Sequence, residues 1–230
     1  MAMSERSTRR VGASAGVVFI LLYSVGSGLL VGPINQSDSL ATAARKFNEQ
    51  THSYNVAATL LIIGVPFSLL FAASLRAVLG RAEGGERQLS SLTLVGAAAS
   101  GAVLLAGAAL MGGTAYLAHY TPVDGATAAF AHSACEACVY YSVVFLGVAA
   151  LVTGWITIQH AAFPRWFGWL AAVLGTAMIV GIAGFPLIRP LALLANIATV
   201  LFILSTSVVI WTSNPAHEPT PLPEQIANLP

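Results

Sequence analysis

Four residues whose side chains can carry chemistry lie close together in one apolar stretch of the chain, between His132 and Tyr140. His132, Glu136 and Tyr140 follow one another at intervals of four, so an α-helix places them on one face, with Cys135 beside them. A charged carboxylate inside a membrane costs about 3 kcal/mol on insertion scales. If the stretch spans a membrane, we therefore expect Glu136 to be protonated, paired or exposed to water, and to mark a candidate functional site.

Three interpretations of this stretch remain open. In the first, Glu136 forms a hydrogen bond with His132 and with neighbouring helices, and the pair holds the fold together. In the second, the two residues handle protons or bind a polar ligand in an outward-facing cavity. In the third, His132, Glu136 and Cys135 ligate a metal or a haem, together with His119 and His52 from nearby segments. Zinc prefers four protein or water ligands, and the spacing of these residues does not require it.

The Cys135-x-x-Cys138 pair resembles a redox motif, but its position argues against that chemistry. Reactive thiolates of this kind lie at the N-terminus of a helix, where free N–H groups stabilise them. Here the pair lies two to three turns inside an apolar segment, so we expect reduced, packed thiols. The sequence also contains none of the Walker, HExxH, GxSxG or Rossmann patterns, which favours a protein that is not an enzyme.

The composition indicates a protein whose solvent is lipid. Of the 230 residues 57% are hydrophobic and only 8% are charged, whereas an ordinary soluble domain carries about 25% charged residues. A chain with so little charge would expose large apolar patches in water and aggregate. The net charge of +1 and the absence of a long Lys/Arg tract give no reason to expect a nucleic-acid partner.

Six stretches are apolar over the roughly 20 residues that a membrane span needs. Because a helix satisfies its own backbone hydrogen bonds in hydrocarbon, we predict an all-α protein with six transmembrane helices in one bundle. The expected spans are about 11–31, 54–79, 92–117, 126–156, 166–188 and 191–211, within a transmembrane domain of residues 1–212. The proline-rich segment 213–230 is expected to be a disordered cytoplasmic tail.

The distribution of positive charge predicts the orientation of the bundle. With the N-terminus inside, seven of the ten Lys and Arg residues lie on the cytoplasmic side, as the positive-inside rule requires. These seven are Arg6, Arg9, Arg10, Arg76, Arg81, Arg87 and Arg165, against Arg45, Lys46 and Arg189 on the outer side. An even number of spans returns the C-terminus to the cytoplasm, so we expect a multi-pass protein of the cytoplasmic membrane.

Two segments need separate interpretation. The basic start and the first apolar run are also typical of a signal peptide, but the run is longer than a usual signal core, so we expect a retained helix. In the first loop, residues 32–53, the apolar residues Leu40, Ala43, Ala44 and Phe47 recur at helical spacing. They predict a short amphipathic helix on the outer surface, acting as an ordered cap over the bundle or as a lid for a partner or substrate.

The segment Phe163-Pro164-Arg165-Trp166-Phe167-Gly168-Trp169-Leu170 precedes the fifth predicted span. It resembles the PRWxGWL-like segment found before the penultimate helix in a family of uncharacterised bacterial multi-helix membrane proteins, a domain of unknown function. Pro33 and Asn48, after the first span, are also similar to that family. The resemblance implies the multi-helix membrane architecture and implies no activity or catalytic residue.

We therefore favour a non-enzymatic bundle that contacts the lipid bilayer and binds a partner protein, a lipid or a small ligand, with a second copy of the chain among the candidate partners. The first alternative is a small transporter or proton-coupled carrier that uses Glu136 and His132. The second is a metal- or haem-binding membrane oxidoreductase. The sequence leaves the cofactor open.

Overall fold

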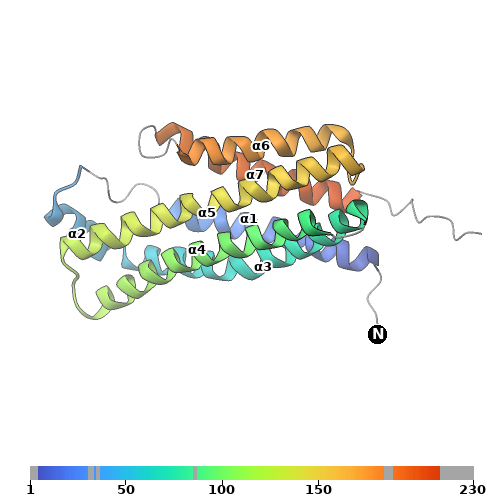
Figure 1. Ribbon diagram of the computed structural model, residues 1–230. Helices are drawn as coiled ribbons and strands as arrows, with labels where there is room; N and C mark the ends of the chain where they lie inside the picture. Colours follow the sequence, from blue (N-terminus) through green and yellow to red (C-terminus); the bar gives the residue numbers. More distant parts are fainter. Residues whose placement is uncertain (1–4, 31–33, 35–36, 85–86, 184–188, 213–230) are drawn as a thin grey trace, which may run out of the picture.

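A computed structural model of the chain describes residues 5–30, 34, 37–84, 87–183 and 189–212, and every element in these ranges is an α-helix (Figure 1). The helices are α1 (Glu5–Leu30), α2 (Leu40–Glu49), α3 (Thr51–Glu83), α4 (Gln88–Tyr120), α5 (Gly125–His160), α6 (Arg165–Ala183) and α7 (Arg189–Thr212). The predicted tail 213–230, the end of the fifth predicted span at 184–188, Val31 at the end of the first, and positions 32, 33, 35 and 36 of the first loop lie outside the described residues.

Six of these helices are long and apolar enough to cross a membrane, which confirms the predicted all-α fold with six spans. The exception is α2, which has only ten residues. At 33 residues each, α3 and α4 are longer than the roughly 20 residues that the hydrocarbon requires. Their ends therefore extend beyond the apolar layer into the interfacial region.

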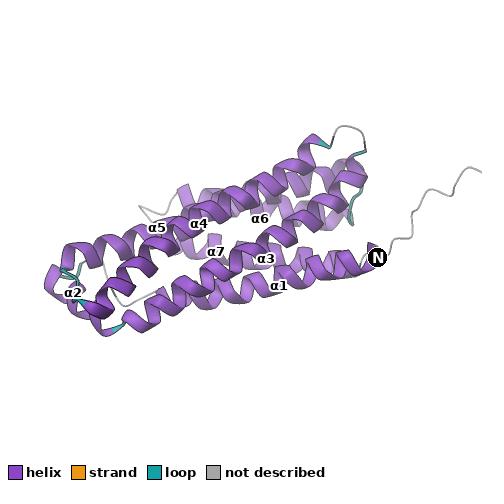
Figure 2. Ribbon diagram, turned by 90° about the horizontal axis from the view of Figure 1, so that it is seen from below, coloured by secondary structure: helices purple, strands orange, loops and turns teal. Residues whose placement is uncertain are grey.

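The six long helices contact one another in the cyclic order α1, α3, α4, α5, α6, α7, with α7 returning to α1 (Figures 1 and 2). Helix α5 also contacts α1, α3 and α7, so it has more neighbours than any other helix. At one end of the bundle α2 packs on α5 and α4. The first turns of α1 and the last turn of α7 meet at the other end, where the Arg10 guanidinium carbon lies 5.5 Å from the centroid of the Trp211 ring.

Glycines let the backbones of neighbouring helices touch on two sides of α5. Towards α6, a Cβ atom added to Gly154 would lie only 2.7 Å from the carbonyl oxygen of Gly168. Towards α4, a Cβ atom on Gly96 would lie 2.8 Å from the carbonyl oxygen of Phe145. Small residues of this kind are the usual means of helix association in lipid, where apolar side chains gain nothing by leaving the acyl chains. These contacts fix α5 between its two neighbours.

Acidic side chains cap the N-termini of α4 and α5. Both carboxylate oxygens of Glu83, the last residue of α3, accept hydrogen bonds from the first turn of α4, each at 2.8 Å, from the N–H groups of Leu89 and Ser90. The first N–H groups of a helix have no partner within the helix, and a carboxylate also interacts favourably with the positive end of the helix dipole. Glu83 therefore joins α3 to α4 across a short connection.

Asp124 caps the N-terminus of α5 in the same manner. Its carboxylate accepts hydrogen bonds from the N–H groups of Ala126 and Thr127, at 2.9 and 3.0 Å, and from the Thr127 hydroxyl at 2.8 Å. The bonds from Thr127, followed by the one from Ala126, stabilise the charged form and lower the pKa of Asp124 below its usual value. The cap is therefore complete at neutral pH.

The glycine contacts predict a selective effect of substitution. Gly154→Leu should lower the free energy of unfolding in mild detergent by about 1–3 kcal/mol, because the side chain must displace the α6 backbone. The measurement is thermal unfolding followed by the loss of helical circular dichroism.

The matched control is Gly113→Leu in α4, since a Cβ atom at Gly113 meets no other atom within 4 Å. This variant should be as stable as the wild type or slightly more stable, because glycine is unfavourable inside a helix. Equal losses in the two variants would contradict the role assigned to the α5–α6 contact.

Candidate functional site

The four candidate residues of the predicted stretch all lie on α5, but they differ in burial. His132 and Cys135 are buried, while Glu136 and Tyr140 are half-buried. All four lie in the half of α5 nearer to α2, since α2 packs on α5 at the end where α5 begins. The stretch thus lies towards the capped end of the bundle.

The other two candidate histidines lie at the same end but on the surface. His119, in the last turn of α4, is exposed and packs edge-on against Tyr120, with 5.2 Å between the ring centroids. His52, in the first turn of α3, is also exposed. Within the ranges that the structure describes, no three His, Cys, Asp or Glu side chains lie close enough together to hold a metal ion.

His132 forms its hydrogen bond with α1 and not with Glu136. Its Nε2 atom lies 3.0 Å from the carbonyl oxygen of Leu30, the last residue of α1. A carbonyl oxygen can only accept, so Nε2 must carry the proton. The last carbonyl groups of a helix have no partner within the helix, and an unpaired one in lipid is costly. His132 therefore caps the C-terminus of α1 from the neighbouring helix.

An aromatic series connects His132 to α2. The ring of Tyr54, near the start of α3, meets His132 edge-on at 6.1 Å between centroids, and Phe47 of α2 stacks on Tyr54 at 4.7 Å. Phe47 and Tyr54 are fully buried. Sequence analysis did not single out Tyr54, because the sequence shows it only as an aromatic residue at the start of a predicted span. Through these rings, α2 packs against the residue that caps α1.

Asn48 attaches α2 to the connection between α4 and α5. Its side-chain amide donates a hydrogen bond to the Val123 carbonyl oxygen and accepts one from the Val123 N–H group, both at 3.1 Å. Lys46 and Asp38 form an ion pair at 2.8 Å on the same segment. Of the apolar residues used to predict a helix in this loop, Ala43 and Phe47 are buried, whereas Leu40 is exposed. The helix is thus held down by Ala43, Phe47 and Asn48, while the Leu40 side chain is exposed.

Glu136 has no bonded partner in the part of the chain that the structure describes, neither a hydrogen bond nor an ion pair. One turn further along α5, Tyr140 lies within electrostatic range of Tyr23 of α1. The Tyr23 hydroxyl in turn donates a hydrogen bond of 2.7 Å to the side-chain oxygen of Asn196 in α7. Polar groups from α1, α5 and α7 therefore approach one another inside the bundle, while the carboxyl group of Glu136 is left unpaired.

The two cysteines are free thiols that pack against α4. A Cβ atom on Gly107 of α4 would lie 2.5 Å from the Cβ atom of Cys138 and 3.3 Å from the Cα atom of Cys135. Gly107 is thus the position at which α4 accommodates both cysteines. The spacing of the pair serves the contact between two helices.

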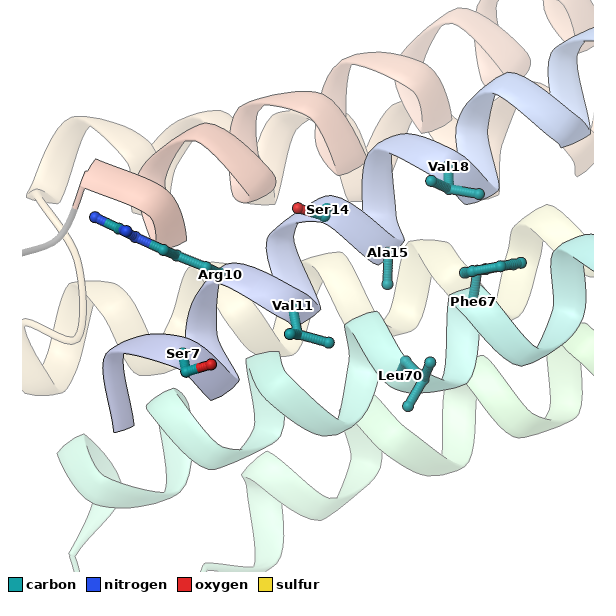
Figure 3. A pocket seen from close by; sticks show the side chains of 8 residues that line it. All are labelled: Ser7, Arg10, Val11, Ser14, Ala15, Val18, Phe67 and Leu70. Carbon is teal, nitrogen blue, oxygen red and sulfur yellow. The ribbon is translucent and has the colours of Figure 1, made fainter. Parts of the chain in front are cut away.

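A surface groove of about 650 Å³ lies at the opposite end of the bundle, between α1 and α3 (Figure 3). Ser7 and Arg10 line it near the start of α1, and its remaining lining is mainly apolar: Val11, Ala15, Val18, Phe67 and Leu70. Sequence analysis missed this groove. The available signal was the spacing of Val11, Ala15 and Val18, which places them on one face of a helix directly after a basic residue.

Arg10 gives this groove its chemical character. Its side chain is exposed, and its guanidinium group lies over the Trp211 ring of α7, an arrangement in which a cation is attracted to the face of the ring. The residues that line the groove include no carboxylate, thiol or imidazole. The arrangement can therefore hold a molecule that is negatively charged at one end and apolar along its length.

A family model described as a domain of unknown function, DUF4386, matches residues 14–212. The match extends from within α1 to the last residue of α7, so it includes the α5 stretch, α2 and most of the groove. No curated protein and no solved structure matches the chain.

The cap on α1 can be tested by removing its donor. His132→Ala should lower the free energy of unfolding in detergent by about 1–3 kcal/mol, because the buried Leu30 carbonyl loses its partner. His119→Ala, which removes an exposed imidazole, is the control and should leave stability within about 0.5 kcal/mol of the wild type. If both variants unfold at the wild-type temperature, His132 does not stabilise the end of α1.

Proposed function

The chain belongs to the DUF4386 family of domains of unknown function, and from this starting point we propose that it is a membrane protein that binds an anionic amphiphile without changing it chemically. Its six apolar helices place it in a lipid bilayer. The observation that supports this function is the groove of about 650 Å³ between α1 and α3, which has Arg10 at one end and an apolar lining.

Arginine suits the charged end of such a ligand. Its planar guanidinium group presents several N–H donors in a fixed geometry that matches the oxygens of a phosphate. The Arg10 side chain is exposed, and the guanidinium carbon lies 5.5 Å from the centroid of the Trp211 ring. Ala15, Val18 and Phe67 line the groove deeper in the membrane, where an acyl chain would lie.

The proposed orientation agrees with this ligand. With the N-terminus in the cytoplasm, Arg10 and Trp211 lie at the headgroup level of the inner leaflet. That leaflet carries the anionic lipids, whose negative potential attracts basic residues near the surface. In this orientation α2 lies on the outer face as an ordered cap.

A charge-removal experiment tests the proposed function. In mixed micelles, Arg10→Gln should weaken the binding of dioleoylphosphatidylglycerol at least tenfold, because loss of a charge-assisted hydrogen bond costs about 1.5–3 kcal/mol. Bound lipid is counted by native mass spectrometry over a range of lipid mole fractions.

Arg165→Gln serves as the matched control. Arg165 is also exposed, lies on the same proposed side of the membrane, and lines neither this groove nor its neighbour along α1. The control should bind the lipid as the wild type does. Equal binding of the lipid by the wild type and by Arg10→Gln would contradict the proposed function.

The unpaired carboxyl group of Glu136 favours a second function, that of a proton-coupled carrier. A half-buried carboxyl group inside a span, with no bonded partner among the described residues, is the kind of group that can exchange protons. His132 lies one turn away, but its Nε2 atom is already bonded to Leu30. The carrier hypothesis therefore depends mainly on Glu136.

Proton flux into proteoliposomes distinguishes this alternative. If the protein is a carrier that uses Glu136, the Glu136→Gln variant should show a pH-driven proton flux at least tenfold lower than that of the wild type. The reason is that an amide cannot release a proton at any accessible pH. The flux is followed with a pH-sensitive dye trapped inside the vesicles. If wild type and variant leak at the same rate as vesicles without protein, the carrier function is excluded.

A further inference from the structure

A second groove runs along the other side of α1, at the same end of the bundle. It has a volume of about 370 Å³ and lies between α1 and α7, where Val17, Val208 and Trp211 form part of its lining. Ser14 and Val18 line both this groove and the larger one between α1 and α3. Figure 3 shows Ser14 and Ala15 pointing to different sides of α1. The two grooves therefore flank one exposed ridge of α1.

One cation serves both grooves. Arg10 lines the larger groove, and its guanidinium group lies 5.5 Å from the centroid of Trp211, which lines the smaller one. Because Arg10 and Val18 are eight residues apart on one helix, the grooves extend about 12 Å below the charge. This depth is most of one leaflet, since the whole hydrocarbon layer is about 30 Å thick.

Hydroxyl groups lie one helical turn below the cation. Ser14 follows Arg10 by four residues in α1, and Ser207 precedes Trp211 by four residues in the antiparallel α7, so each hydroxyl lies about 6 Å deeper. The Ser14 side chain is exposed and lines both grooves, whereas the Ser207 hydroxyl oxygen is buried against Gly16 of α1. The Ser14 hydroxyl at this depth matches the ester carbonyl oxygens of a phospholipid, which lie just below its phosphate.

We propose that the two grooves together form a site for one anionic phospholipid with two acyl chains, which straddles the α1 ridge with its phosphate at Arg10 and one chain in each groove. This inference rests on the proposed function, and it adds the number of chains and the second groove. Charge, a hydroxyl donor and two apolar channels occur in the order in which a diacyl phospholipid presents phosphate, esters and chains. A single-chain amphiphile would leave one groove unused.

The test compares one-chain and two-chain lipids with the same headgroup. Dioleoylphosphatidylglycerol should bind the wild-type protein at least tenfold more tightly than 1-oleoyl-lysophosphatidylglycerol, measured by native mass spectrometry at matched mole fractions in mixed micelles. Dioleoylphosphatidylcholine, which has the same chains and no net charge, should bind at least tenfold more weakly than its anionic counterpart.

A variant that fills the smaller groove separates the two grooves. Val208→Trp places a large side chain there while leaving the larger groove intact, because Val208 lines only the smaller one. It should reduce the affinity for the diacyl lipid to that for the lyso lipid, and leave the lyso lipid's affinity unchanged. The control is Val173→Trp on α6, which is equally exposed but lines neither groove and should retain the preference for two chains.

The outcomes distinguish the two proposals. If the lyso and diacyl lipids bind equally well and both require Arg10, the two-chain site is overturned while the proposed function stands. The same conclusion follows if Val208→Trp retains the wild-type preference for the diacyl lipid. If neither anionic lipid binds in a manner that depends on Arg10, both proposals fail.

Discussion

The hydrocarbon of a membrane gives apolar helices no reason to leave the acyl chains, so the position of α5 depends on glycines that let neighbouring backbones touch. Gly96 provides the contact with α4, and Gly154 and Gly168 provide the contact with α6. Every polar residue of interest on α5 takes its depth and direction from this placement. His132 meets the end of α1, and Glu136 has no bonded partner among the residues that the structure describes, because α5 is held at this rotation.

The parts of the fold that sequence analysis predicted are those encoded by consecutive residues. A span depends on the mean hydropathy of about 20 neighbouring positions, so the six helices and the family resemblance could be derived from the chain alone. The hydrogen-bond partners of single polar groups could not be derived in this way. Leu30 lies 102 residues before His132, and Val123 lies 75 residues after Asn48, and no local pattern links either pair.

The candidate sites illustrate the same limit. The ionisable stretch of α5 was evident because a carboxyl group within an apolar run is conspicuous in any sequence. The grooves beside α1 were not evident, since their shape depends on how far α3 and α7 stand from α1 at Phe67 and Trp211. Arg10 was counted only as one of several basic residues that orient the bundle. Its contact with Trp211 requires α7 to lie beside α1, which the sequence does not specify.

The contact between α1 and α7 also has a consequence for biogenesis. The hydrogen bond from Tyr23 to Asn196 joins residues that are 173 positions apart, so it can form only after nearly all of the helices have left the ribosome. Until then α1 borders lipid where α7 will later pack, and the Tyr23 hydroxyl lacks the acceptor that it has in the finished protein. Membrane insertion of α1 and closure of the helix ring are therefore separate events, and the second waits for the last span to be synthesised.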